Sequence, residues 1–155
     1  MSREDVIALA KVRLEEMLSF FGYNVHAEVV ELDGDVELRV PSDDSGRLIG
    51  HHGETLRAIQ HIINMIVRNA TSHSHEHLYI SVDIAGYKQA RAKALGEQGI
   101  AAADRVAASG EEQALAPMSA AERRMVHMAI ADRTDVVTES RGEEPKRFIV
   151  IKPRA

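Results

Sequence analysis

The sequence predicts an α+β fold in two modules, and three kinds of pattern support this prediction. Apolar residues recur at helical spacing in some segments, alternate with polar residues in others, and are separated by turn signals rich in Gly, Pro and Asp. The 155 residues are enough for one domain or two small ones. We expect a first module at residues 1–84, a helical connector at 85–110 and a second module at 111–155.

The first module is expected to open with a helix and a two-stranded hairpin. Residues 2–21 begin with a capping-box pattern and carry apolar side chains at helical spacing. Residues 24–32 and 36–40 alternate as strands on either side of Asp33-Gly34, a strong hairpin-turn signal. These segments predict a helix followed by two antiparallel strands.

The remainder of the first module is expected to contain two helices and a third strand. A short helix is predicted at residues 42–49, followed by a turn at Gly50–Gly53 and by a helix whose apolar stripe covers residues 56–66. A polar loop at residues 69–76 leads into an alternating strand at 78–84. The predicted order is helix, strand, strand, helix, turn, helix, strand.

The second half of the chain begins with an alanine-rich segment. Residues 86–109 predict a helix that is interrupted or weakened at Gly96 and Gly99. Beyond it we expect a short strand, a helix and two strands, at residues 113–115, 119–131, 136–138 and 148–151. Met118, Met125 and Met128 are expected to fill the core rather than to form a groove for a partner.

The composition excludes several classes of protein. The chain has no cysteine, which excludes a disulfide scaffold, a thiolate zinc site and a cysteine nucleophile. Residues 1–5 are too polar and acidic for a signal peptide, and no apolar run approaches the roughly 20 residues of a membrane span. We therefore expect a cytoplasmic protein that does not insert into a membrane.

The charge is acidic overall but unevenly distributed. The formal net charge is −5, which argues mildly against nucleic acid as a partner. Residues 1–84 hold seven Lys/Arg and fourteen Asp/Glu, whereas residues 85–155 hold twelve and ten. Because binding depends on local potential as well as on total charge, a polyanion remains a candidate ligand, with modest and salt-sensitive affinity.

Gly50 and Gly53 are the strongest candidates for a binding loop. Glycine lets a backbone approach a ligand closely, and the first amides of the following helix can face a phosphate. The candidate contact residues in and around this loop are Arg47, Ile49, Gly50, His51, His52, Gly53 and Arg57. Because imidazole is largely neutral at pH 7, binding through the loop is expected to strengthen as the pH falls toward about 6. The alternative is an ordinary turn between helices.

Arg123 and His127 form a second candidate site. Residues four apart share one face of a helix, arginine offers a planar fork for phosphate, and histidine can bind a phosphate or stack on a base. Arg141, Lys146 and Arg147 could extend the basic surface. The alternative is a solvated helix face.

These motifs resemble two known domains. The element order, with Gly-x-x-Gly between the second and third helices, resembles the type II KH domain, whose loop clamps about four nucleotides. In a KH cleft we expect Leu48, Ile49, Ile59 and the neighbouring strand to form an apolar floor for the bases. His61 lies within the helix and is expected to be a half-exposed side chain rather than a ligand. The Arg-x-x-x-His pair and the Ser-x-Gly-Glu-x-Pro segment at residues 140–145 resemble the R3H domain, which binds single-stranded nucleic acid.

KH followed by R3H is the layout of the Jag, or SpoIIIJ-associated, family of bacterial cytosolic RNA-binding proteins. The resemblance covers nearly the whole chain. Many Jag proteins carry an additional N-terminal domain that this sequence lacks, so the role of that domain is not expected here. His51 and His52 also stand where the family often has basic residues.

Metal binding and catalysis are less well supported. His73, His75 and His77 alternate before the third strand and could hold zinc or nickel. No carboxylate or further histidine is clearly placed to complete such a site, so we favour a polar surface loop and expect no metal or cofactor. The sequence has no nucleophile elbow, Walker loop or dinucleotide fingerprint, so we expect neither catalytic residues nor an enzyme.

The sequence therefore favours a protein that binds single-stranded RNA, with single-stranded DNA as an open alternative ligand, and that acts in post-transcriptional regulation. The second hypothesis is a protein-interaction adaptor whose KH half mainly mediates dimerisation. Family resemblance implies self-association or association with a small single-KH protein. The two hypotheses differ in whether RNA or a second protein occupies the first module.

Overall fold

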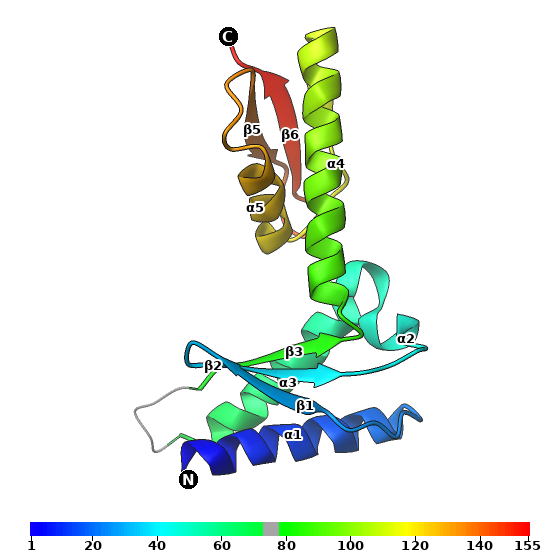
Figure 1. The fold of residues 1–155 in the computed structure, drawn as a ribbon, viewed down its shortest axis with the longest axis vertical. Coiled ribbons are helices and arrows are strands. Elements are labelled where there is room, and N and C mark those ends of the chain that lie inside the picture. The colour runs from blue at the N-terminus through cyan, green and yellow to red at the C-terminus, as the bar shows by residue number, and fades with distance from the viewer. Residues whose placement is uncertain (73–77) are drawn as a thin grey trace. The chain divides into compact units, whose positions relative to one another are not determined.

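The computed structural model describes residues 1–72 and 78–155, which divide into two compact units (Figure 1). The first unit contains Met1–Lys88 and the second contains Gln89–Ala155. Both contain helices and strands, which confirms the α+β class. Within the described ranges, no helix is long and apolar enough to cross a membrane.

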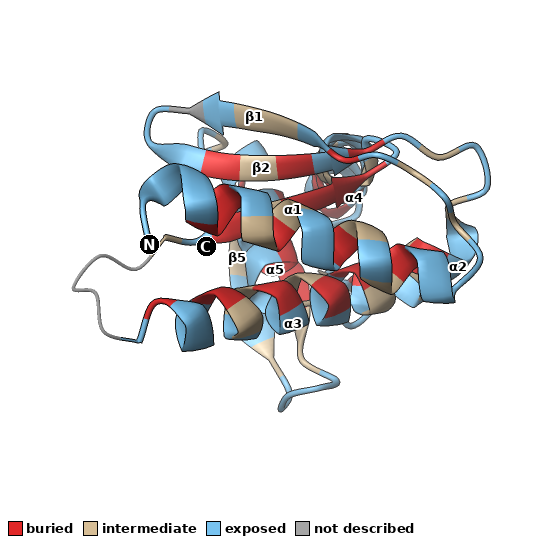
Figure 2. Ribbon diagram, turned by 90° about the horizontal axis from the view of Figure 1, so that it is seen from below, coloured by how far each residue is buried: buried red, intermediate tan, exposed pale blue. Residues whose placement is uncertain are grey.

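The first unit is a three-stranded sheet with two long helices across one face. Its elements are α1 (Arg3–Phe20), β1 (Glu28–Leu32), β2 (Asp35–Val40), α2 (Gly46–Ile49), α3 (Glu54–Ala70) and β3 (Ile80–Ile84). The strand order is β1-β2-β3, with β1 antiparallel and β3 parallel to β2. Helices α1 and α3 lie side by side, each with a buried stripe (Figure 2). The predicted order of elements is confirmed.

Local signals in the sequence explain where α1 begins and ends. The hydroxyl of Ser2 accepts a hydrogen bond from the N–H of Asp5, whose carboxylate accepts one from the N–H of Ser2, so the capping box forms. The helix ends just before Gly22, which has a φ of 87°. Strand β1 begins later than expected, at Glu28, and the N–H of the preceding residue, Ala27, donates to the Glu15 carboxylate of α1.

The core of the first unit follows the two periodicities in its sequence. Val36, Leu38 and Val40 alternate on β2 and are all buried, as the strand pattern predicts. Leu14 from α1 and Ile63 from α3 are completely buried against them. Each such side chain contributes about 1.5–3 kcal/mol of burial free energy. This packing fixes α3 and β3, the two elements that border the candidate site.

The second unit packs two helices with a separate three-stranded sheet. Its elements are α4 (Tyr87–Ser109), whose first two residues belong to the first unit, β4 (Gln113–Ala114), α5 (Ala120–Ala129), β5 (Val136–Arg141) and β6 (Phe148–Pro153). The strand order is β4-β6-β5, and both pairings are antiparallel. Leu95, Ala103 and Val106 of α4 belong to the same core as Ile149 and Ile151 of β6. Most of the expected connector at 85–110 is thus built into the second unit.

Helix α4 is continuous, so the interruption expected at Gly96 and Gly99 is wrong. Both glycines lie where α5 packs against α4. A Cβ on Gly99 would lie 3.0 Å from Cγ1 of Val126, and a Cβ on Gly96 would lie 3.7 Å from Cβ of Ala129. The glycines therefore allow two helices to approach closely, and this packing offsets their poor helix propensity.

Helix α5 buries a different face from the one that its methionines suggested. Glu122, Arg123 and Val126 are buried, whereas Met125 and Met128 are 39% and 61% exposed. The expectation that the methionines fill the core is therefore wrong for Met125 and Met128, whereas Met118 is buried in the core of the second unit. The two charged residues can turn inward because each has a partner of opposite charge, described below.

Candidate nucleic-acid interface

The Gly50–Gly53 turn joins α2 to α3 in a conformation that favours glycine at both ends. The φ angles of Gly50 and Gly53 are 71° and 79°, in the left-handed region. A Cβ on Gly50 would lie 2.9 Å from Cβ of Thr55, and one on Gly53 would lie 2.8 Å from the ring of Tyr87. Both glycines are therefore required by the packing of the turn itself, whatever ligand it holds.

The two residues between the glycines are exposed. The rings of His51 and His52 stack, with centroids 3.9 Å apart and an interplanar angle of 23°. The guanidinium of Arg57 on α3 donates to the carbonyl oxygen of His52 at 3.0 Å. Arg47 on α2 is also exposed, whereas Ile49 is half-buried against the core. The structure thus brings all seven predicted loop residues together around one turn.

A groove of about 630 Å³ runs along α3 beside the start of β3. Its lining residues are Arg57, Gln60, His61, Asn64, Arg68, Thr71, Leu78 and Tyr79. Arg57, which lines the groove, also donates to the carbonyl oxygen of His52, so one side chain borders both the turn and the groove. The sequence predicted only Arg57. Polar residues at positions 57, 60–61, 64 and 68 return to one side of the helix every three or four residues, and this polar stripe is the signal that could have revealed the groove.

Two expectations about residues near the groove need correction. Leu48 and Ile59 are 2% and 3% exposed and belong to the hydrophobic core, so they are not an apolar floor open to bases. His61, expected to be half-exposed, is exposed and lines the groove. Helical periodicity marks apolar positions correctly, but it does not separate core positions from positions that border a groove.

Side chains of α3 occupy the free edge of β3. Oδ1 of Asn64 accepts from the N–H of Ile80 at 2.9 Å, and Nδ2 of Asn64 donates to the Ile80 carbonyl at 2.7 Å. Oε1 of Gln60 accepts from the N–H of Val82 at 3.0 Å and from Nζ of Lys88 at 2.8 Å. The backbone edge beside the groove is therefore already hydrogen-bonded at these positions.

Lys88 is a half-buried cation behind this edge. Burial lowers the pKa of its ammonium, while the carboxylates of Glu37 and Asp83 act in the opposite direction. Its Nζ also donates to Oγ of Ser81 at 2.6 Å. These contacts hold the ammonium beside Gln60 instead of in solvent.

In the second unit, Arg123 and His127 do not share one exposed face. Arg123 is only 8% exposed. Its guanidinium donates to the Met118 carbonyl at 2.8 Å and to the Glu144 carboxylate at 2.9 Å. His127 is exposed, and its Nδ1 lies 2.5 Å from Oγ1 of Thr138. The spacing placed both residues on one helix correctly, but packing separates their environments.

Glu122 is the second charged residue on the buried face of α5. Its carboxylate accepts from Nε of Arg91 on α4 at 2.9 Å and from the N–H of Ser119 at 2.9 Å. Burial by itself raises the pKa of Glu122, but these donors lower it by more, so its pKa lies below the usual range. The predicted capping box at Ser119 is also present.

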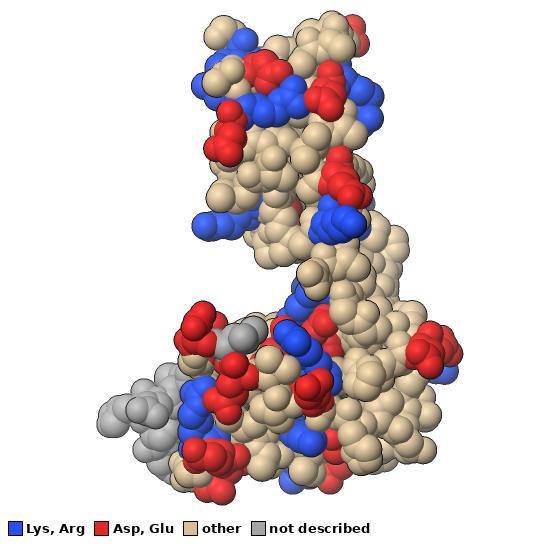
Figure 3. Space-filling view, viewed as in Figure 1, with Lys and Arg blue, Asp and Glu red and all other residues tan. Residues whose placement is uncertain are grey.

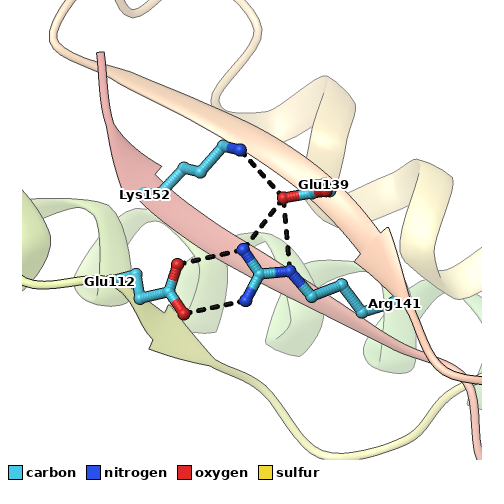
Figure 4. Close-up of polar contacts among 4 residues, drawn as sticks. All are labelled: Glu112, Glu139, Arg141 and Lys152. Carbon is cyan, nitrogen blue, oxygen red and sulfur yellow. Dashed lines mark hydrogen bonds and ion pairs between the residues drawn. The ribbon is translucent and has the colours of Figure 1, made fainter. Parts of the chain in front are cut away.

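Arg141 is held in a network of ions on the sheet (Figure 4). Its guanidinium makes two hydrogen bonds to the Glu112 carboxylate, at 2.8 and 3.0 Å, and also binds Glu139. Lys152 donates to the same Glu139 at 2.8 Å. These hydrogen bonds lower the pKa values of Glu112 and Glu139 and raise that of Arg141. Arg141 is therefore already bound to carboxylates.

Other basic side chains of the second unit have fewer polar partners. Lys146 and Arg124 are exposed, and no ion pair to either occurs in the described part of the chain. Arg147 is half-buried, and its Nε has no hydrogen-bond partner among the residues placed by the structure. The sequence prediction included Lys146 and Arg147 but missed Arg124, which directly follows the Arg of the motif. On the face shown in Figure 3, cations and carboxylates are interspersed on each unit.

The histidine hypothesis at His73, His75 and His77 lies outside the described residues. Within residues 1–72 and 78–155, no group of three or more His, Asp or Glu side chains is arranged to hold a metal ion.

Comparisons with known proteins match both units. Residues 11–83 match the family model described as KhpA/KhpB, KH domain, and residues 94–153 match the R3H domain. The R3H match includes most of α4, consistent with the packing of that helix in the second core.

The curated relatives share one description, RNA-binding protein KhpB. The relative from Clostridium symbiosum is 30% identical over 83% of this chain and 56% of its own length. That from Streptococcus pneumoniae serotype 2 (strain D39) is 30% identical over 75% of this chain and 34% of its own. The relative from Bacillus subtilis (strain 168) is 25% identical over 95% of this chain and 70% of its own. The chain thus spans about half of the length of the first relative and about a third of the length of the second.

Proposed function

Because the chain belongs to the Jag-type family, in which a KH domain precedes an R3H domain, we propose that it binds single-stranded RNA and acts in post-transcriptional regulation. The observation that carries this proposal is that Arg57 borders both the Gly50–Gly53 turn and the groove along α3. An RNA clamp needs a turn that can face phosphates and a neighbouring groove that can take bases.

In the first unit, the turn holds the sugar-phosphate chain. The backbone at Gly50–Gly53 approaches it, and Arg47 and Arg57 supply positive charge. The exposed rings of His51 and His52 lie at the same turn and offer hydrogen bonds or a stacking surface. Ile49 provides apolar contact at its edge. The bases enter the groove beside α3.

In the second unit, a further single-stranded segment binds near α5. His127, Arg124, Lys146 and Arg147 provide the contacts. Arg123 and Arg141 support this surface indirectly, because carboxylates already bind their guanidinium groups. Two weak sites on one chain reinforce each other through effective concentration, which offsets the acidic total charge.

The experiment that tests this function replaces the exposed loop residues and leaves the glycines in place. Substituting Gly50 or Gly53 would create close contacts with Thr55 or Tyr87, so lost binding there could report altered packing. His51→Asp combined with His52→Asp adds two negative charges at the turn and should weaken RNA binding about tenfold or more.

The matched control is Asn24→Asp combined with His26→Asp, which adds the same charge at exposed positions that do not line the groove. Filter binding at low and physiological salt would measure both variants. Equal affinity of the loop variant and the control would remove the turn from the proposed function.

A protein-interaction adaptor is the second candidate, because the first unit exposes large apolar side chains. Phe20 is 91% exposed, Phe21 51%, Ile62 44% and Met65 47%. Such residues suit self-association or contact with a small single-KH protein. Light scattering with and without RNA, followed by crosslinking, discriminates: an oligomer that gives no RNA crosslinks favours the adaptor.

A further inference from the structure

The amide of Gln60 is held in one orientation. Its Oε1 accepts from two donors, the N–H of Val82 and the Nζ of Lys88. Rotating the amide by half a turn would place its NH₂ group against both donors and leave them without an acceptor, which costs free energy. The nitrogen of Gln60 therefore lies on the side of Tyr79.

Tyr79 completes a pair of neighbouring donors. Nε2 of Gln60 donates to the hydroxyl oxygen of Tyr79 at 2.5 Å. The hydroxyl thereby accepts, and its own hydrogen remains available to a ligand. No acceptor for the second Nε2 hydrogen occurs among the residues that the structure describes. Tyr79 is 59% exposed and lines the groove, so a ligand can reach both its hydroxyl and its ring.

The backbone edge of β3 has few groups left to hydrogen-bond a base. Asn64 is hydrogen-bonded to the N–H and the carbonyl of Ile80, and Gln60 accepts from the N–H of Val82. A base in the groove would therefore contact the polar ends of side chains instead of a free strand edge. Which bases bind depends on the hydrogen bonds that these side chains can donate or accept.

Two adjacent donors match only some bases. Cytosine presents adjacent acceptors at O2 and N3, and guanine presents adjacent acceptors at O6 and N7. On adenine an N6 amino donor stands beside N1 and N7, and on uracil the N3–H donor separates the two carbonyl oxygens. A donor pair leaves an unfavourable donor–donor contact with either of these bases.

We propose that Tyr79 and Gln60 read one base in the groove and select cytosine or guanine over adenine or uracil, an inference that rests on the proposed RNA binding. The ring of Tyr79 also provides a face on which that base or its neighbour stacks. Lys88 acts as a positioning residue, because its ammonium fixes the Gln60 amide without touching the base.

The test measures binding of the full chain to four fluorescent RNA octanucleotides, of cytidine, adenosine, uridine and alternating uridine and guanosine. We expect the cytidine and guanosine RNAs to bind about five- to tenfold more tightly than the other two. Tyr79→Phe keeps the ring and removes the donor, so the preference should fall to about twofold while adenosine RNA binds as before.

Gln60→Glu replaces the donor with an acceptor and should shift the preference toward adenosine. Met65→Glu is its control, because it adds the same charge at an exposed position of α3 that does not line the groove. The control should weaken all four RNAs equally. Lys88→Met should reduce the preference, and Lys88→Arg should restore most of it.

The outcomes separate this inference from the proposed function. Tight but equal binding of all four RNAs by the unchanged protein overturns the base-reading pair and leaves RNA binding intact. A preference that persists unchanged in both Tyr79→Phe and Gln60→Glu also overturns it. Failure to bind any of the four RNAs would refute the proposed function, and this inference with it.

Discussion

Arg123 and Glu144 form an ion pair, in which Nη2 of the arginine lies 2.9 Å from Oε1 of the glutamate. This pair connects α5 to the segment between β5 and β6. The arginine side chain is 9% exposed and the glutamate side chain 58%. Since Arg123 also donates to the Met118 carbonyl, it satisfies a backbone acceptor next to the helix start. The arginine of the Arg-x-x-x-His motif is thus a structural element of the second unit.

Arg123→Ala should therefore destabilise the second unit as well as weaken RNA binding. Losing the hydrogen bonds of a buried guanidinium should cost about 1–3 kcal/mol of unfolding free energy. Urea denaturation followed by circular dichroism measures this loss. Arg124→Ala is the matched control: it should keep its stability within about 0.5 kcal/mol and lose RNA affinity alone. Equal stability of both variants would contradict the structural role of Arg123.

Substituting Gly96 or Gly99 by alanine should change the stability of the protein by different amounts. At Gly96 a Cβ makes only ordinary contact with Ala129, so Gly96→Ala should stabilise the protein by about 0.5–1 kcal/mol through helix propensity. At Gly99 a Cβ would press on Val126, so Gly99→Ala should gain less and Gly99→Val should destabilise. Thermal denaturation of the three variants tests this predicted order of stabilities. Equal gains at both positions would mean that α4 and α5 do not pack as described.

Glu122 should make the stability of the second unit depend on acidity. Its pKa is lower in the folded chain than its ordinary value of 4.5. The carboxylate therefore contributes stability above about pH 4.5, and this contribution disappears as the pH falls through the lowered pKa. Glu122→Gln should flatten the loss of stability between about pH 5 and pH 3.

Urea midpoints measured across this range test the Glu122 prediction. Glu97→Gln, on the exposed surface of α4, is the control and should follow the unchanged protein. A Glu122→Gln variant with the same pH slope as the control would exclude a linked carboxylate at this position.

RNA binding through the turn is expected to strengthen as the pH falls from about 8 to about 6, because a protonated histidine attracts phosphate and His51 and His52 are exposed at the turn. Fluorescence anisotropy at both pH values measures the effect. The variant with His51→Gln and His52→Gln should lose this dependence; if it keeps the dependence, another group is responsible.

The sequence by itself determined the elements and their order. Capping boxes at Ser2 and Ser119, the Asp33-Gly34 turn and the alternation on β2 are local signals, and each depends on residues a few positions apart. The Gly50–Gly53 turn was also predictable, because its backbone requires glycine. Together with the Arg-x-x-x-His pair and the Ser-x-Gly-Glu-x-Pro segment, these features indicated the KH and R3H domains.

Only the tertiary structure decided which side chains face inward and which remain available to a ligand. Arg123 and Glu122 are buried and Met125 and Met128 exposed because partners from other elements, Glu144 and Arg91, neutralise the charges. Gln60 and Asn64 bind β3, which lies 16 or more residues away along the chain. Such contacts depend on residues that are distant in sequence, so no local periodicity contains them.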